Sequence, residues 1–303
     1  MGTTVDAVAV VTGGSHIGRR NGALALTDAA AEACLARAGI EAGEVDLLVN
    51  VGIYHDKNLG EPALAALIQE DIGAHPEDPH GGGHGTFSFD VANGACGMLT
   101  GLRVVHGFLS AGTIRHALVV AGDANPGRRL TNRFPFAPTG AAIACGWQDD
   151  QGGLVAFRFG NRPGADLFRG RVGVERGRNK LRIEEAPEFA ARAGSLAGEV
   201  AGKLLTDRGL APDDVDVVVA NPLTPAFLAA LRTELGLSGS QVVAADGRPP
   251  VHTAGLAVAW DEARQQDRLT DGATVLLVSA GAGLTAGAAV LRMPPAPPPA
   301  DRT

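Results

Sequence analysis

The chain has 303 residues, a formal net charge of −7 and only 4% aromatic residues. This length accommodates one large α/β unit or two closely packed halves. The acidic balance and the lack of a dense basic run argue against nucleic acid as the main partner. No uninterrupted apolar run is long enough to span a membrane and no signal peptide is visible, so we expect a cytoplasmic protein.

The first elements along the chain introduce a pattern that recurs later. Residues 37–49 have the order of a helix end, a glycine stop, an acidic loop and an all-apolar strand, and residues 207–219 repeat this order. Residues 116–122 and 274–280 form a second pair of apolar strands. Strands of this kind are buried on both faces, as in parallel or mixed sheets. The repeat predicts a layered α/β fold of two similar halves.

We place these halves at residues 1–150 and 151–293. The first contains the candidate nucleophile, and the second contains the candidate polar groups. The last residues, 294–303, are rich in proline and are expected to form a loose, disordered tail.

The cysteines and the clustered histidines give no sign of a metal site or a disulfide framework. Cys34 and Cys145 lie in apolar segments and are expected in the core. His80 and His84 lie in a glycine-rich loop without a cluster of further ligands, which favours a surface loop. We expect no bound metal.

The third cysteine, Cys96, lies in the most informative segment. Residues 87–102 predict a short strand, a tight turn and the first turn of an apolar helix. A thiol at a helix start lies near the positive end of the helix dipole, which favours the thiolate and the binding of anions. The small neighbours Gly94, Ala95 and Gly97 allow a substrate carbonyl to approach closely. A buried core cysteine is the alternative.

Two segments in the middle of the chain could contact a substrate. Phe134 and Phe136 precede an apolar strand and could line an acyl tunnel, although simple packing explains them equally well. Residues 168–182 form the most basic stretch, which is typical of a solvated surface. This stretch could instead receive an acidic carrier protein or a coenzyme phosphate.

Two polar residues of the second half complete a candidate site. Asn221 ends a buried strand, so its amide is expected at the carboxyl edge of the sheet, where ligands bind in open α/β folds. Capping the following helix is the alternative role. His252 opens a small-residue helix, and the repeat places it close to the position that matches Cys96. The sequence therefore predicts a thiol–imidazole pair, in which the base activates the thiol.

A glycine-rich turn follows the predicted strand 274–280. Gly281, Ala282 and Gly283 could present backbone N–H groups to an oxyanion, together with the N–H of Cys96.

With these segments in order, the chain resembles the thiolase superfamily and, within it, the type III ketoacyl-acyl-carrier-protein synthases. The resemblance covers nearly the whole length, from residues 17–20 through 94–97 to 281–292. It implies a five-layered α-β-α-β-α fold and a homodimer. It also implies an acyl thioester of coenzyme A or of an acyl-carrier protein as substrate, with no resident cofactor.

The site differs from the family pattern at two places. Type III synthases carry histidine at the position of Asn221 and asparagine at the position of His252, so the two residues are exchanged here, in an order similar to that of thiolases. Ser279 stands where thiolases have a second cysteine, and we expect it to contact the substrate.

These features predict an acyltransferase in fatty-acid, polyketide or secondary metabolism. Cys96 would attack the thioester and form an acyl-enzyme while His252 takes its proton. His252 and Asn221 would then activate an acceptor for Claisen condensation, or an alcohol or amine for ester or amide formation. Two alternatives stay open, namely a catalytically silent partner subunit of a synthase and a thioester hydrolase with the same Cys–His pair.

Overall fold

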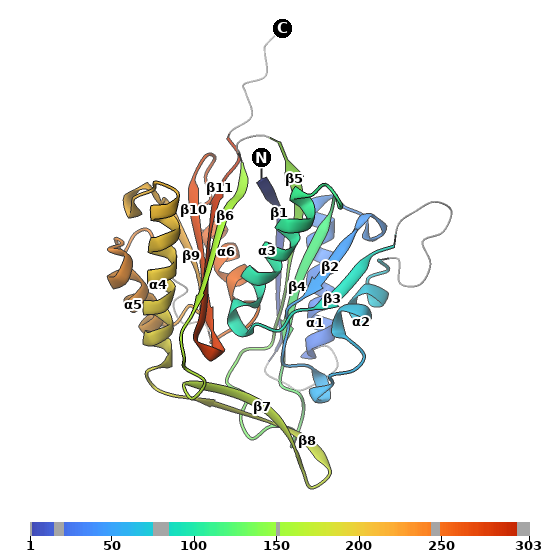
Figure 1. Cartoon of the computed structure of the whole chain (residues 1–303). Helices are drawn as coiled ribbons and strands as arrows, with labels where there is room; N and C mark the ends of the chain where they lie inside the picture. Colours follow the sequence, from blue (N-terminus) through green and yellow to red (C-terminus); the bar gives the residue numbers. More distant parts are fainter. Residues whose placement is uncertain (1, 15–20, 75–84, 150–151, 244–248, 296–303) are drawn as a thin grey trace.

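A computed structural model of the chain describes residues 2–14, 21–74, 85–149, 152–243 and 249–295 (Figure 1). Within these residues the main sheet has nine strands in the order β3-β2-β4-β5-β1-β6-β11-β10-β9. Its five N-terminal strands lie together, and its four C-terminal strands follow across the contact between β1 and β6. The strands are β1 (Gly2–Thr12), β2 (Leu47–Asn50), β3 (Phe87–Asp90), β4 (Ala117–Asp123), β5 (Thr139–Gln148), β6 (Gly153–Asn161), β9 (Val217–Asn221), β10 (Thr274–Gly281) and β11 (Thr285–Arg292).

Helices cover the sheet in an order that produces five layers. The helices α1 and α2 pack on the outer face of the N-terminal strands, and α4 and α5 pack outside the C-terminal strands. Between the two halves lie α3 and α6, which contact strands of both (Figure 1). This arrangement confirms the predicted layered α/β fold. The helices are α1 (Ala23–Ala38), α2 (Leu64–Asp71), α3 (Gly97–Ser110), α4 (Phe189–Asp207), α5 (Pro225–Leu235) and α6 (Gly255–Gln265).

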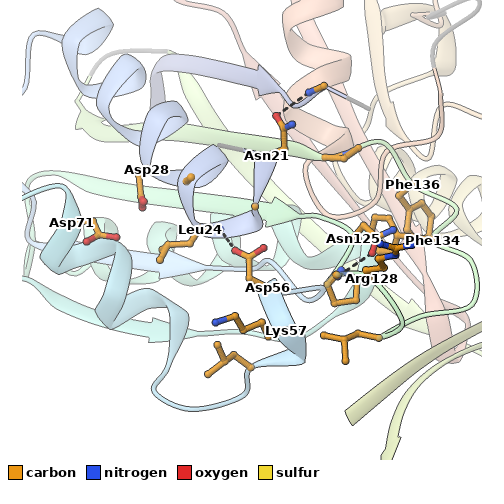
Figure 2. A pocket seen from close by; sticks show the side chains of 18 residues that line it. Asn21, Leu24, Asp28, Asp56, Lys57, Asp71, Asn125, Arg128, Phe134 and Phe136 are labelled. Atoms are coloured by element: carbon orange, nitrogen blue, oxygen red, sulfur yellow. Dashed lines mark hydrogen bonds between the residues drawn. The ribbon is translucent and has the colours of Figure 1, made fainter. Parts of the chain in front are cut away.

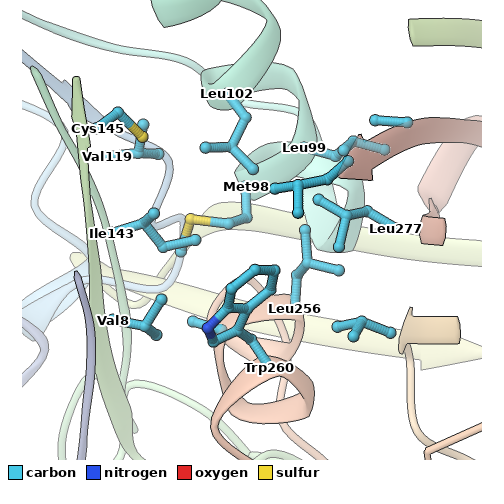
Figure 3. Packing of buried hydrophobic residues seen from close by; sticks show 14 of the residues in the cluster. Val8, Met98, Leu99, Leu102, Val119, Ile143, Cys145, Leu256, Trp260 and Leu277 are labelled. Atoms are coloured by element: carbon cyan, nitrogen blue, oxygen red, sulfur yellow. The ribbon is translucent and has the colours of Figure 1, made fainter. Parts of the chain in front are cut away.

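The central helices are fixed by a hydrophobic cluster that draws on both halves. Met98 and Leu102 of α3 pack with Trp260 of α6, against Ile143 of one half and Leu277 of the other (Figure 3). Each large apolar side chain buried in this way contributes about 1.5–3 kcal/mol. The cluster therefore holds the N-termini of α3 and α6 in fixed positions.

Two aspartates at equivalent positions of the two halves explain part of the sequence repeat. The Asp46 carboxylate, just before β2, accepts hydrogen bonds from the N–H groups of Arg115 (2.7 Å) and His116 (3.0 Å) before β4. In the second half, Asp216 accepts one from the N–H of Thr274 at 2.8 Å. Each aspartate thus joins the starts of two parallel neighbouring strands. The pairs Val45-Asp46 and Val215-Asp216, the Val-Asp motif of the repeat, therefore lie at matching positions of the two halves.

The described residues also form an element outside the main sheet. A separate hairpin of β7 (Phe168–Glu175) and β8 (Arg178–Glu185) projects from the body (Figure 1).

Cys34 and Cys145 are fully buried, as predicted. None of the described helices is long and apolar enough to cross a membrane. Most of the proline-rich tail, residues 296–303, lies outside the described residues, and the boundaries of the two halves stay a prediction.

Candidate active site

His252 lies just before α6, next to a buried carboxylate that the sequence analysis missed. Its ring nitrogen Nδ1 is 3.4 Å from Oδ2 of Asp123, the last residue of β4, and both side chains are almost completely buried. Because Nδ1 faces the carboxylate, Nε2 is the ring nitrogen left for a substrate. A carboxylate in this place orients the imidazole and stabilises the imidazolium.

Asp123 is held in its charged form by several donors. Its Oδ1 accepts hydrogen bonds from the N–H groups of Ile53 (3.1 Å) and Tyr54 (2.8 Å). Its Oδ2 accepts from the N–H of Thr253 at 2.9 Å and from the Thr253 hydroxyl. Burial opposes the charge, but His252, Thr253 and Tyr54 together hold the pKa of Asp123 below its ordinary value. The pair is therefore an ionised carboxylate beside an imidazole.

Aromatic rings hold the imidazole from several sides. The ring of Phe136 stacks on His252 with centroids 4.7 Å apart, and the ring of Tyr54 lies at 4.9 Å. The ring of Phe168, at the start of β7, is nearly parallel to the imidazole at 6.2 Å. The imidazole of His252 thus has one fixed orientation in apolar surroundings.

His252 opens onto a small cavity of about 120 Å³. Its walls come from the turn before α3, the segment before α6, the start of α4 and the end of β10. Glu185 lies at its edge, where burial raises the pKa of the carboxyl although the nearby His252 lowers it. The cavity is lined by Ala95, Pro135, Phe136, Phe168, Glu185, Phe189, Ala190, Pro222, Thr224, Pro250, Val251, His252, Ala280, Gly281 and Ala282.

The structure places Cys96 differently from the prediction. Its side chain is completely buried, and Sγ donates to the carbonyl oxygen of Ser279 at 3.7 Å. The residue of this turn that lines the cavity with His252 is Ala95. The turn over Gly94–Cys96 is a 3₁₀ helix, in which successive side chains point about 120° apart. The helix begins where we expected, but the thiol of Cys96 points into the core.

Two properties of Cys96 follow from this position. Burial raises the pKa of the Cys96 thiol to about 12, although a hydrogen bond with Thr100 lowers it. At neutral pH the thiolate is therefore a very small fraction. The N–H of Cys96, a predicted oxyanion donor, already donates to the carbonyl of Asn93 at 3.1 Å. Neither group is presented to the cavity of His252.

Asn221 joins the two segments that form the site. Its Nδ2 donates to the carbonyl oxygens of Ala95 (2.7 Å) and His252 (3.1 Å), while Oδ1 has no hydrogen-bond partner among the described residues. Asn221 is fully buried, and its closeness to the N-terminus of α6 requires the glycine at position 255, where a Cβ would lie 2.0 Å from Oδ1. The predicted amide thus holds the turn of Ala95 against the segment of His252.

The glycine-rich turn lies beside the turn of Ala95. A Cβ on Gly281 would lie 3.0 Å from the backbone nitrogen of Ala95, and both Gly281 and Ala282 line the cavity. Gly283 follows at a positive φ of 71°. We expected Ser279 to contact the substrate. In the structure it is fully buried, its hydroxyl has no partner among the described residues, and it does not line the cavity.

A larger cavity of about 890 Å³ shares one lining residue, Phe136, with the first. Figure 2 shows Phe134 and Phe136 at one end of it and Asp28 and Asp71 at the other. Burial and the neighbouring Asp71 carboxylate raise the pKa of Asp28 to about 8. The two phenylalanines line this cavity, and their role in an acyl tunnel stays a prediction.

No metal site is evident in the described part of the chain, where no three His, Cys, Asp or Glu side chains are suitably grouped. His80 and His84 lie outside the described residues.

Comparisons with known proteins agree with this architecture. Residues 205–293 match the model of the 3-oxoacyl-[acyl-carrier-protein] synthase III C-terminal family. Beta-ketoacyl-[acyl-carrier-protein] synthase III of Rhodospirillum rubrum is 27% identical over 288 residues, which cover 88% of this chain and 83% of that protein. Over most of its length the chain is therefore similar to the ketoacyl synthase III proteins, which are thiolase-like condensing enzymes. The corresponding synthase of Sphingopyxis alaskensis is 29% identical, covering 87% and 82% of the two chains.

Solved structures of ketoacyl synthase III proteins share the fold. That of Pseudomonas aeruginosa superimposes with a TM-score of 0.82 at 24% identity, over 98% of this chain and all of that one. OleA from Xanthomonas campestris reaches 0.77 at 16% identity, over 96% and 98%. These likenesses confirm the thiolase-like fold.

Proposed function

We propose that the His252 cavity transfers an acyl group from a thioester to an acceptor hydroxyl or amine without an acyl-cysteine intermediate. The observation that carries this proposal is the His252–Asp123 pair, set beside a cavity to which the turn before α3 contributes Ala95. The synthases that this chain resembles are named for the acyl-carrier protein. This name supports a thioester of such a carrier protein or of coenzyme A as the donor.

The chemistry needs only groups that this chain provides. Nε2 of His252 takes the proton of the acceptor as its oxygen or nitrogen attacks the thioester carbonyl. Backbone N–H groups of residues 281–283 stabilise the resulting oxyanion, and such donors are typically worth about 10²–10³ in rate. The C–S bond then breaks, and the imidazolium returns the proton to the departing thiolate. Asp123 stays ionised throughout and holds the ring.

The position of Cys96 favours an ester or amide over a new carbon–carbon bond. Claisen condensation joins two thioesters, which normally enter one after the other because a cysteine keeps the first acyl group. The Cys96 thiol is buried against the carbonyl oxygen of Ser279, so it is not placed to keep that group. Transfer from a single thioester to a hydroxyl or amine needs no such cysteine.

A catalytically silent partner subunit is the second candidate, because Ala95 supplies no nucleophile to the cavity.

A homodimer is consistent with either function. The edge strand β3 pairs only with β2 on one side in the described sheet, and its Phe87 side chain is 59% exposed. Exposed edges of this kind readily pair with another chain.

Thiol release by the purified protein tests the proposal. The wild type is incubated with acyl-coenzyme A thioesters of increasing chain length, with and without alcohol or amine acceptors, and the released thiol is followed with a chromogenic reagent. We expect release that depends on the acceptor and an acylated acceptor in the mass spectrum. Free acid formed without acceptor would indicate a hydrolase, whereas no release from any thioester would favour the silent partner.

A further inference from the structure

The cavity beside His252 has a single carboxylate in its wall. Among the described residues that line it, Glu185 is the only aspartate, glutamate, lysine or arginine. His252 becomes a cation only when it takes a proton, and the Asp123 carboxylate beside it then balances that charge. The negative charge of Glu185 is therefore not neutralised by any side chain of this wall.

The β7–β8 hairpin places Glu185 on the side of the cavity and away from its own basic side chains. In an antiparallel pair, residues opposite each other share a face, and Glu185 is paired with Phe168, whose side chain also lines the cavity. The next pair, Arg169 with Glu184, faces the other way. The ion pairs within the hairpin use Glu175 and Glu184 instead. The exposed carboxylate of Glu185 is thus left for a ligand of the cavity.

Aromatic rings form much of the remaining wall. Phe168 and Phe189 lie with their ring centroids 5.3 Å apart, and Phe136 stacks on the imidazole of His252 at 4.7 Å. All three phenylalanines line the cavity. The face of a phenyl ring has a negative electrostatic potential and attracts cations, above all quaternary ammonium groups. A carboxylate beside such rings is therefore suited to a positively charged nitrogen.

We propose that this cavity selects an alcohol acceptor with a positively charged nitrogen, which Glu185 and the phenylalanine rings hold while the hydroxyl faces His252. This inference rests on the proposed acyl transfer at His252, because it names the acceptor of that reaction. Glu185 is a specificity-determining residue in this scheme, since it binds the nitrogen and takes no part in the proton transfer.

The reaction balances with the groups already described. His252 takes the hydroxyl proton while the oxygen forms the new C–O bond to the acyl carbon. The C–S bond then breaks, and the imidazolium returns the proton to the departing thiolate. The products are a cationic ester and a free thiol, and no further reactant is needed.

Two alcohols of the same shape separate the effect of charge from that of size. Choline has a quaternary nitrogen that cannot itself be acylated, and its neutral analogue has a tert-butyl group in place of the trimethylammonium group. Thiol release from acetyl-coenzyme A is measured with each alcohol for the wild type, Glu185→Gln and Glu184→Gln. Glu184→Gln is the matched control, because it removes the same charge from the neighbouring residue on the opposite face of β8. Thermal unfolding confirms that both variants are folded.

We expect the wild type to favour choline over the neutral alcohol at least about tenfold in kcat/KM. In Glu185→Gln this preference should fall at least about fivefold, because only the rings still attract the cation, whereas in Glu184→Gln it should stay within about twofold. Equal use of the two alcohols by the wild type would overturn the inference. An unchanged preference in folded Glu185→Gln would overturn it as well.

A wild type that releases no thiol with any acceptor would contradict the proposed function, and the cation site is then decided by binding. Calorimetry with choline alone measures this binding. Weaker binding by Glu185→Gln than by Glu184→Gln would support the site, whereas equal binding by the two variants, or no binding by the wild type, would refute it.

Discussion

Replacing His252 by alanine is expected to lower kcat for acyl transfer about 10³-fold, because a positioned general base typically contributes about 10²–10⁴. The fold should survive, since the carbonyl of residue 252, which accepts the hydrogen bond of Asn221, belongs to the backbone. The assay is thiol release at saturating acceptor, with circular dichroism and thermal unfolding to confirm the folded state.

Two further variants distinguish the effect of the imidazole on the rate from the effects of the residues around it. Asp123→Asn removes the charge that stabilises the imidazolium, and we expect a loss of at least about 10²-fold. Tyr54→Phe keeps the ring that lies 4.9 Å from His252, and its rate should stay within about fivefold. A folded His252→Ala protein with more than a tenth of the wild-type rate would show that the base lies elsewhere.

Ala95→Cys is expected to place a cysteine nucleophile in the His252 cavity. The new thiol would start from the residue that lines the His252 cavity, where a neighbouring imidazole lowers the pKa of a cysteine. Incubation with acetyl-coenzyme A should therefore add about 42 Da to the intact protein, the mass of one acetyl group. The wild type should show no such adduct.

The position of the adduct provides the control for this experiment. The double variant Ala95→Cys with Cys96→Ala should be acetylated equally well, and peptide mapping should place the group on residue 95. Iodoacetamide should also react faster with this thiol than with Cys96, whose pKa is about 12. An adduct on Cys96 in the wild type would reverse our assignment of the two positions.

The fold could be predicted from the sequence because its signals are local. Apolar strands, glycine stops and the Val-Asp motif recur in both halves, and Asp46 and Asp216 perform the same task in each. The approach of the segments around Ala95 and His252 followed from the same repeat, and Asn221 does join them.

The details of the site depended on geometry that the sequence does not display. Whether residue 95 or 96 faces the cavity is decided by the phase of one 3₁₀ turn, which begins at Gly94 with φ of 53°. Asp123 is far from His252 along the chain, and only the packing of α6 between the halves brings them together. The available signal was a carboxylate, Asp123, directly after the predicted strand 116–122, just as Asn221 ends a predicted strand.

The rate of thiol release by Cys96→Ala tests most directly whether transfer proceeds without an acyl-cysteine. Removing a thiol that is buried against the carbonyl of Ser279 costs some packing but takes nothing from the His252 cavity. We predict that the folded variant keeps kcat/KM within about threefold of the wild type. A loss of about 10³-fold or more, in a variant with unchanged thermal unfolding, would contradict this mechanism and assign the nucleophile to Cys96.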